Sequence, residues 1–568
     1  MDALAASLAG ITLPPSPAFT DDDDDPLGRA PPRIGFNIEP KLCQFILSRR
    51  NNVTASIPLE IRSSTIAPGS GSGLFVGRNP PILSSNNKPD LRYDGIEAGR
   101  EIYRSKPLML AVEDEGICHF CWREQKGMKA CTGCRVARFC DKQCQKMAWN
   151  RFHKEECGVL KKTPLMKRQD LLVCRVVWFQ QRGFITSEQG RVVEGLENHF
   201  DGYTREEGGK TTEVYDVAMG IREVTGQGGR KMVDVGLIWR LVPALRTNCV
   251  RLRAASSKDI VATALDLATA MINHSCEPNA FAFLEKGEIR VRSLRKIAAG
   301  EEITICYIDP TIDVKSRQEI LMDEHFFECD CTRCKAEIKI QKRLIAADGE
   351  TSMVTLRKAQ LAILELIKSA VTASKYPGVY KEFENLSVVE SQMLTIMKNA
   401  FPNNNWRSDI DPVPMARICL GVLYLEQEKP SQALRNVLRG RFTGGKRRVG
   451  PDAVNIMVDV VHVLMAAGCL PLDSPVLKDK EFPSLLDISN VTYGFLHEAC
   501  KDAGEVFGGD CGYTKEIGDL FAKMMGTLPE GQHRPGEEGF LGEFEGSLRR
   551  ALGWAGVEVG GLGGEKSG

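Results

Sequence analysis

The feature that most restricts how this chain can fold is a dense group of cysteines between residues 118 and 157. Seven cysteines and two histidines, His119 and His153, occur within these forty residues, and several of the cysteines form pairs separated by two or three residues; His119 is not needed to complete the ligand count. Such pairs can bind one metal ion together, and a structural zinc takes four ligands. Eight ligands therefore predict two zinc ions, although the spacing alone allows more than one partition. The ligands are Cys118, Cys121, Cys131, Cys134, Cys140, Cys144, His153 and Cys157.

The composition is that of an intracellular protein. A chain of 568 residues is long enough for several domains, and its 74 basic and 74 acidic residues balance, so direct nucleic-acid binding is not expected. The N-terminus lacks a basic region before its short apolar run, so no signal or transit peptide is predicted. The longest apolar segment, residues 457–470, contains Asp459 and His462 and is too short for a membrane span. We therefore expect a protein of the nucleus and/or cytoplasm, with reduced thiols and no membrane partner.

A second group of polar and reactive residues lies later in the chain. Residues 271–279 read Met-Ile-Asn-His-Ser-Cys-Glu-Pro-Asn, and residues 300–307 read Gly-Glu-Glu-Ile-Thr-Ile-Cys-Tyr. Polar, reactive residues between an apolar run and a strand-like run indicate the end of a buried element, where functional residues often lie. The alternation of apolar residues from 281 to 305 predicts antiparallel strands that bring Tyr307 close to Asn273. On these strands Arg290, Arg292, Arg295 and Lys296 are predicted to face solvent.

Three further cysteines, Cys329, Cys331 and Cys334, also have metal-ligand spacing. A structural zinc needs a fourth ligand, and Cys276 in the reactive segment is the natural candidate. This assignment predicts a third zinc that holds Phe327 over the reactive segment. A glycine-rich turn at residues 69–73, followed by a strand that begins at Leu74, allows close backbone approach upstream of these motifs.

The remaining segments are predicted mostly to be helical or irregular. Residues 1–35 form an acidic tail that we expect to be disordered, and residues 528–568 a glycine-rich tail that we expect to be mobile. A helix is expected in the stretch 36–59, and residues 415–427 and 431–438 are predicted to pair like a tetratricopeptide hairpin, although no strict repeat recurs. Other helices are predicted at residues 171–179, 192–200, 233–245, 262–272, 356–367 and 388–397.

The motifs at residues 271–279, 300–307 and 329–334 resemble the second half of a SET domain, the fold of S-adenosylmethionine-dependent protein lysine methyltransferases. The cysteine group resembles a MYND zinc finger inserted into that domain. The resemblance covers residues 36–526 and implies an α+β, multidomain chain: a SET-type β fold interrupted by a MYND finger and followed by a tetratricopeptide-like helical domain. The implied segments are 36–112 (first SET part), 113–160 (finger), 161–310 (SET insert and catalytic core), 311–340 (post-SET zinc region) and 341–527 (helical domain), between the tails 1–35 and 528–568.

The resemblance also implies site residues. In MYND fingers the ligands interleave, so Cys118, Cys121, Cys140 and Cys144 would hold one zinc and Cys131, Cys134, His153 and Cys157 the other. Tyr307 is the implied catalytic residue. The implied S-adenosylmethionine-binding residues are Gly71, Gly73, Leu74, Asn248, Asn273, His274, Tyr307 and Phe327. Two positions depart from the family: Ser72, where relatives often have Asn, and Asp266, where they commonly have an aromatic residue.

The function that the resemblance implies is methyl transfer to a lysine side chain of a histone or another protein, with a finger that binds proline-containing peptides. A free lysine has a pKa of about 10.4, so the enzyme would have to favour the neutral amine with an apolar channel. The alternative is a catalytically weak or inactive zinc-binding scaffold that acts in protein interaction or transcriptional regulation. The intact Asn273, His274 and Tyr307 favour the enzyme, whereas Ser72 and Asp266 keep the scaffold open.

Overall fold

The structure is a computed structural model of the whole chain. It describes residues 40–48, 57–66, 71–78, 94–204, 210–226, 232–257, 259–376, 378, 381–403, 406, 410–442, 450–471, 473–478, 481–528 and 532–557. The contacts divide the chain into two compact units, residues 1–307 with 322–327 and residues 308–321 with 328–568. This division is coarser than the seven predicted segments, whose boundaries remain proposals. The predicted tail 1–35 lies outside the described residues.

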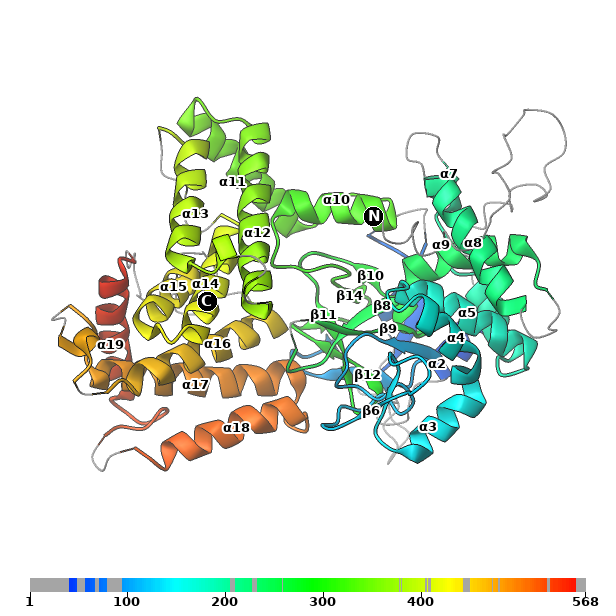
Figure 1. Cartoon of the computed structure of the whole chain (residues 1–568), viewed down its shortest axis with the longest axis horizontal. Helices are drawn as coiled ribbons and strands as arrows, with labels where there is room; N and C mark the ends of the chain where they lie inside the picture. The colour runs from blue at the N-terminus through cyan, green and yellow to red at the C-terminus, as the bar shows by residue number, and fades with distance from the viewer. Residues whose placement is uncertain are drawn as a thin grey trace. The chain divides into compact units, whose positions relative to one another are not determined.

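The first unit is built from short, mostly antiparallel strands that pair in small sheets (Figure 1). The consecutive strands β1 and β2 pair antiparallel, whereas the parallel pairing of β10 with β14 brings two separate motifs together. The strands are β1 (Leu59–Ser63), β2 (Ser72–Val76), β3 (Gly95–Ile96), β4 (Glu101–Ser105), β5 (Met109–Val112), β6 (Lys129–Ala130), β7 (Arg138–Phe139), β8 (Val250–Arg253), β9 (Ile260–Leu265), β10 (Asn273–His274), β11 (Ala280–Glu285), β12 (Glu288–Ser293), β13 (Ile297–Ala298) and β14 (Thr304–Ile305).

The predicted hairpin after the reactive segment is confirmed. β11 pairs with β12 from Ala280↔Ser293 to Glu285↔Glu288, and Lys286 and Gly287 turn the chain with positive φ values of 52° and 83°. The prediction for Arg290 and Arg292 is wrong, because both side chains are buried. β12 is the central strand between β11 and β4, and Arg290 pairs there with Glu101 and Glu285 at 2.5 Å each.

The predicted helix at 262–272 is also wrong. The first part of this run is strand β9, which lies between β5 and β8, and a 3-10 turn over Thr269–Met271 follows. Every residue of β9 after Ile260 is buried, so its apolar run has no alternation to distinguish a strand from a buried helix.

Helices surround these strands in the first unit. α5, α8 and α9 pack against one another, and α5 also contacts β5 and β9 (Figure 1). The helix predicted at 192–200 is interrupted, because α6 ends before Gly195 and α7 begins only at Phe200. The helices are α2 (Pro40–Ser48), α3 (Lys142–Ala148), η2 (Trp149–His153), α4 (Lys154–Lys162), α5 (Arg168–Gln181), α6 (Ser187–Glu194), α7 (Phe200–Thr204), α8 (Lys210–Gly226) and α9 (Val235–Asn248).

The second unit is helical in the part of the chain that the structure describes. The predicted pair at 415–438 is confirmed as α14 and α15, which approach closely at Gly421: a Cβ there would lie 2.4 Å from Cγ1 of Val437. A polar network adds specificity, since Arg417 donates to Glu390 (2.5 Å) and Asn436 (2.8 Å). The helices are α10 (Val314–His325, whose end belongs to the first unit), α11 (Thr332–Asp348), α12 (Met353–Lys375), η5 (Lys381–Phe383), α13 (Leu386–Ala400), α14 (Val413–Glu426), α15 (Pro430–Phe442), α16 (Pro451–Gly468), α17 (Leu485–Phe507), α18 (Gly512–Met525) and α19 (Phe540–Ala555).

The prediction that 528–568 is a mobile tail is wrong for much of its length. Residues 540–555 form helix α19, which buries Phe540, Phe544 and Leu548 and packs on α15 and α17. Gly494 of α17 allows this contact, because a Cβ there would lie 2.2 Å from the ring of Phe544. The glycine content of the segment concealed an apolar face with helical spacing.

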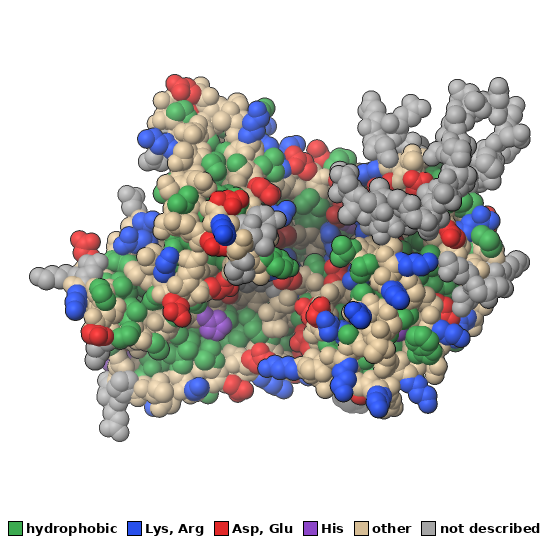
Figure 2. Space-filling view, in the orientation of Figure 1, with side chains coloured by type: hydrophobic (Ala, Val, Ile, Leu, Met, Phe, Trp, Pro, Cys, Tyr) green, Lys and Arg blue, Asp and Glu red, His purple; other side chains and the backbone are tan. Residues whose placement is uncertain are grey.

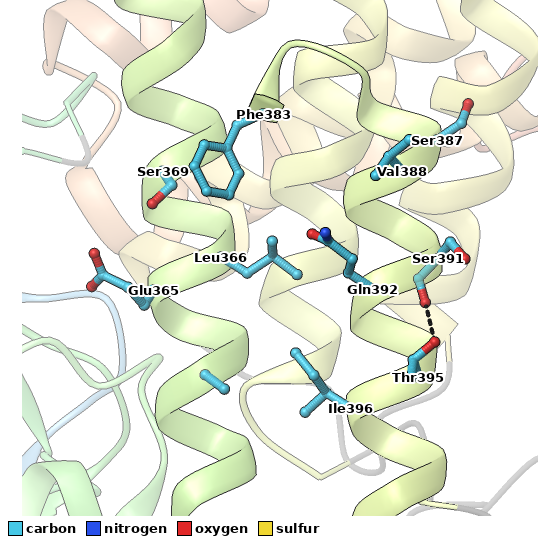
Figure 3. A pocket seen from close by; sticks show the side chains of 11 residues that line it. Glu365, Leu366, Ser369, Phe383, Ser387, Val388, Ser391, Gln392, Thr395 and Ile396 are labelled. Atoms are coloured by element: carbon cyan, nitrogen blue, oxygen red, sulfur yellow. Dashed lines mark hydrogen bonds between the residues drawn. The ribbon is translucent and has the colours of Figure 1, made fainter. Parts of the chain in front are cut away.

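The described surface includes a groove in the second unit and, in Figure 2, a face of mixed side-chain types. A groove of about 710 Å³ lies between α12 and α13 and is lined by Leu366, Phe383, Ile396 and neighbouring side chains, none of them a predicted site residue (Figure 3). Hydrophobic side chains are exposed among interspersed charges of both signs on the face in Figure 2.

Among the described residues, α16 alone has the length and composition to cross a membrane, but 44% of it is buried and it contacts α15 and α17.

Candidate active site and zinc centres

The glycine-rich segment lies against the segment that contains Glu302. The backbone N–H of Ile303 donates to the carbonyl of Leu74 (2.8 Å), and the N–H of Val76 donates to the carbonyl of Glu301 (3.0 Å). A Cβ at Gly73 would lie 2.3 Å from Oε1 of Glu302, so glycine is required at this position for the close approach. At Gly71, by contrast, a Cβ would meet nothing within 4 Å.

Glu302 is a buried carboxylate that connects three segments. Its side chain accepts hydrogen bonds from Ser64 Oγ (2.9 Å), from the N–H and Oγ1 of Thr65 (both 2.7 Å), and from Asn273 Nδ2 (2.7 Å). Glu302 is 4% exposed, so these donors replace the water that a carboxylate would otherwise bind. The sequence around Glu302 does not predict this role, because Ser64 and Thr65 lie 238 and 237 residues earlier.

The predicted cofactor residue Asn273 is fixed by the same network. Its side-chain amide donates to Glu302 and, at 3.1 Å, to the backbone carbonyl of Ser72. This hydrogen bond uses only the backbone of Ser72, so having Ser instead of the Asn that is common in the family does not disturb it. Asn273 therefore joins the glycine strand to the reactive segment.

His274 links the reactive segment to Tyr307 and to a cysteine. Its Nδ1 accepts the backbone N–H of Tyr307 (3.0 Å), so a neutral ring carries its proton on Nε2. Nε2 lies 3.2 Å from Sγ of Cys276 and can donate to it. Both ring nitrogens are thus engaged inside the protein.

The hydroxyl of Tyr307 donates to the carbonyl of Ile272 at 2.7 Å, which fixes the direction of its O–H bond. Burial raises the pKa of this phenol, and the negative charge of Glu302 adds to the effect, so Tyr307 is neutral at physiological pH. Its oxygen keeps lone pairs that can accept a hydrogen bond.

Aromatic rings surround Tyr307. The ring of His325 lies 4.9 Å from it and that of His274 5.2 Å from it, between centroids, and Phe327 lies 5.8 Å from His274. His325 and Phe327 come from residues 322–327, which we call the aromatic strap. The sequence predicted Phe327 here but missed His325.

His325 is unusual within this ring cluster. It is 6% exposed, and its Nδ1 has no hydrogen-bond partner among the described residues. Burial lowers the pKa of His325 to about 3, with Arg251 contributing repulsion, so the ring is neutral at physiological pH. A neutral, buried wall beside Tyr307 disfavours a charged ammonium and favours an amine.

Two other predicted or noted positions have structural partners. Asn248 donates to the carbonyls of Glu197 (2.6 Å) and Ala244 (2.7 Å), within the inserted helices. Asp266 accepts from the N–H and hydroxyl of Thr269 (both 2.8 Å) and from Ser105 (2.9 Å), and so caps the 3-10 turn that leads into the reactive segment. The acid at this departure from the family pattern therefore has a local structural role.

The cysteine group forms two closed sets of four ligands. One ligand atom of each residue lies within 4.8 Å of the others in its set, and the partition is the interleaved one. Ligands 2.3 Å from a tetrahedral zinc are about 3.8 Å apart. The separations Cys121–Cys140 and Cys131–Cys157 are both 3.8 Å between sulfurs. The sets are Cys118, Cys121, Cys140, Cys144 and Cys131, Cys134, His153, Cys157.

A third set contains Cys276, Cys329, Cys331 and Cys334, again with all ligand atoms within 4.8 Å of one another. The predicted fourth ligand is therefore confirmed as a member of this set. Three sets of four soft ligands without an open position fit structural zinc. His274 Nε2 is then an outer partner of the third site through Cys276.

The finger, residues 113–160, is anchored to the strands around it. Glu156 precedes the ligand Cys157 and forms a buried ion pair with Arg175 of α5, whose guanidinium also donates to the carbonyl of Leu110 on β5. At the hairpin turn, a Cβ on Gly287 would lie 2.4 Å from the carbonyl oxygen of Cys121. The inserted segment is thus packed on the unit that contains it.

Comparisons with known proteins agree with this geometry. Residues 95–308, which include both finger sets, match the family model of the SET domain. The histone-lysine N-methyltransferase Smyd1 of Mus musculus is 24% identical over 286 residues, 48% of this chain and 57% of that protein. The histone-lysine N-methyltransferase SMYD3 of Homo sapiens is 28% identical over 250 residues (43% and 58%), and the SET domain and MYND-type zinc finger protein 6 of Schizosaccharomyces pombe is 27% identical over 290 (49% and 55%). The chain spans little more than half the length of these curated relatives.

Proposed function

We propose that this chain, which carries a SET domain and is homologous to SET and MYND lysine methyltransferases, transfers a methyl group from S-adenosylmethionine to a lysine side chain of a histone or another protein. The observation that carries the proposal is that Asn273 binds both the glycine strand and Glu302, while its chain neighbours Ile272 and His274 bind Tyr307. These segments are far apart in the sequence, and each was predicted to serve the same reaction.

S-adenosylmethionine would supply an activated methyl group on its sulfonium. We propose that backbone groups of Gly71, Gly73, Leu74 and His274 hold it, because the side chains of Asn273 and His274 already have internal partners. Asn273 then contributes mainly by fixing the strand. Asn248 remains a proposed contact from the helical side, and Phe327 from the aromatic strap.

The chemical difficulty is the charge on lysine. Presenting a neutral amine near pH 7 costs about 3.4 pKa units, or about 4.6 kcal/mol. The neutral His325, the ring of Phe327 and the buried phenol of Tyr307 make an enclosure that reduces this cost by disfavouring the ammonium. Tyr307 Oη, oriented by the carbonyl of Ile272, can accept an N–H of the amine and direct its lone pair.

The zinc ions have structural roles in this proposal. The third site, which includes Cys276 of the reactive segment, holds that segment in place, and the other two hold the finger.

We propose that the finger binds proline-containing peptides, and that substrates are proteins rather than nucleic acids or membranes. Fifteen of the nineteen cysteines lie in the first 334 residues, the part of the chain that contains the three sets of metal ligands. None of the nineteen is paired in a disulfide, which supports an address in the nucleus and/or cytoplasm.

The substitution Tyr307→Phe tests the mechanism, because it removes only the hydroxyl. Loss of one positioned polar group in comparable sites costs about 2.7–4 kcal/mol of transition-state stabilisation, so turnover on a histone mixture or protein extract should fall about a hundredfold or more. Binding of S-adenosylmethionine, measured by calorimetry, should not change.

Three outcomes distinguish the alternatives. Equal rates for both forms would show that Tyr307 is structural and that the mechanism is wrong. Absence of S-adenosylmethionine binding in the unmodified chain would favour the scaffold over the enzyme. Binding of the cofactor by both forms with transfer only in the unmodified chain is the expected result.

A further inference from the structure

We propose that the inserted helices fasten the aromatic strap, and that Gly202 of α7 is the positioning residue that sets where His325 and Phe327 lie. The inference rests on the proposed function, since the strap supplies the wall of the amine site. Gly202 and Phe326 themselves are not among the predicted site residues. Both belong to the first unit.

The tightest contact of the strap is between Phe326 and Gly202. A Cβ on Gly202 would lie 2.5 Å from Cδ1 and 2.7 Å from Cγ of the Phe326 ring, so the ring rests directly on the glycine backbone. Tyr203 packs edge-on against the same ring, with centroids 4.7 Å apart, and His199 lies 5.6 Å away. Phe326 has a positive φ of 60°, a conformation that a non-glycine residue keeps only when its surroundings impose it.

Two ion pairs tie the strap at its other residues. Lys210 Nζ of α8 lies 2.6 Å from Oδ1 of Asp323 and 5.3 Å from the centroid of Phe326. Arg251 Nη2 of β8 lies 2.6 Å from Oε2 of Glu324. The side chains are 26–68% exposed in the first pair and 30–39% in the second, and exposed pairs are weak. The packing of Phe326 on Gly202 therefore decides the position of the strap, and the ion pairs adjust it.

The position of Phe326 matters because its two neighbours in sequence face the site. His325 lies against Tyr307, and Phe327 lies against His274. A displacement of Phe326 away from α7 must move both neighbours, since successive residues are joined by a rigid peptide unit. The helical insertion thus controls the width of the amine enclosure without contributing a ring to it.

Gly202→Ala in the full-length, zinc-loaded chain tests this inference. The added methyl group has no room, and its φ is not in the left-handed region, so the effect is steric. Hydrogen exchange at 322–327 should accelerate by about tenfold or more, and KM for a histone-tail peptide should rise by a similar factor. The affinity for S-adenosylmethionine should change by a smaller factor, because Phe327 is the only residue of the strap among the proposed cofactor contacts. Gly220→Ala on α8 is the matched control, because a Cβ there meets nothing within 4 Å, and it should change neither quantity.

A compensating variant separates positioning from general damage. Gly202→Ala combined with Phe326→Leu relieves the clash and should restore slow exchange and much of the peptide KM. If Gly202→Ala does not yield folded protein, Tyr203→Leu carries the test, because it removes the α7 ring that packs edge-on against Phe326, and it should raise strap exchange by a smaller factor. Unchanged exchange and KM in the variant that folds would overturn the inference. Failure of the unmodified chain to transfer methyl groups would overturn the proposed function instead, and the exchange measurement would still report on the strap.

Discussion

The finger and the glycine strand are held in place by opposite means. All eight finger ligands come from forty consecutive residues and need only a metal ion between them. Glu302, in contrast, binds Ser64 and Thr65 from 238 and 237 residues earlier and needs no metal. The finger is therefore ordered by an ion that can be removed, whereas the strand is ordered by hydrogen bonds that form only when the unit folds. The comparison shows how one unit combines two independent sources of order.

Removal of zinc should have the largest effect, and it should distinguish the finger from the glycine strand. Binding of a structural zinc is worth about 10–16 kcal/mol in isolated fingers, far more than the stability of a small domain, so a strong chelator should unfold residues 113–160. Metal analysis before chelation should find three ions per chain. Cys131→Ser should lower the number of zinc ions bound by the finger. Cys329→Ser should reduce methyl transfer more than Cys131→Ser does, because the site of Cys329 lies beside the reactive segment. A count of two in the unmodified chain would contradict the third site.

Glu302→Gln should act on the strand and leave the finger intact. Glutamine has nearly the same size, but an NH2 group that cannot accept hydrogen bonds replaces one of the two carboxylate oxygens. At least one buried donor of Ser64, Thr65 or Asn273 therefore loses its partner, at about 1–3 kcal/mol. We expect a lower Tm, weaker binding of S-adenosylmethionine and an unchanged zinc count. Glu277→Gln, at an exposed acid in the reactive segment, is the control. A loss of zinc in Glu302→Gln would mean that the two regions are not independent.

Gln125→Ala should have the smallest effect. Gln125 is exposed on the finger, and surface changes of this kind usually alter stability by less than about 0.5 kcal/mol. Capture of a proline-containing peptide should weaken if this surface binds it, while methylation of a short peptide should continue at the same rate. Equal loss of both activities would place the finger within the catalytic unit.

The sequence predicted the finger ligands and the hairpin because both depend on local spacing. The fourth ligand Cys276 was reached by counting ligands. Sequence reasoning could not predict that Arg290 is buried, because its partner Glu101 lies 189 residues earlier. It also could not predict that the buried apolar run of β9 is a strand. His325 and Glu302 were missed for the same reason: a single polar residue gains its role from rings or donors that only the folded chain brings to it.

The buried pair of Glu156 and Arg175 has a thermodynamic consequence. Removing one partner of such a pair strands a charge at a cost of about 3–5 kcal/mol, so the helix that carries Cys157 and helix α5 are energetically coupled. Coupling of this kind is reciprocal. Zinc bound by Cys157 favours the packing of α5 on β5, and a well-packed α5 raises the affinity of that site for zinc by the same factor. Zinc binding at the site of Cys157 and the packing of α5 on β5 are therefore linked quantities, and a change in either can be measured through the other.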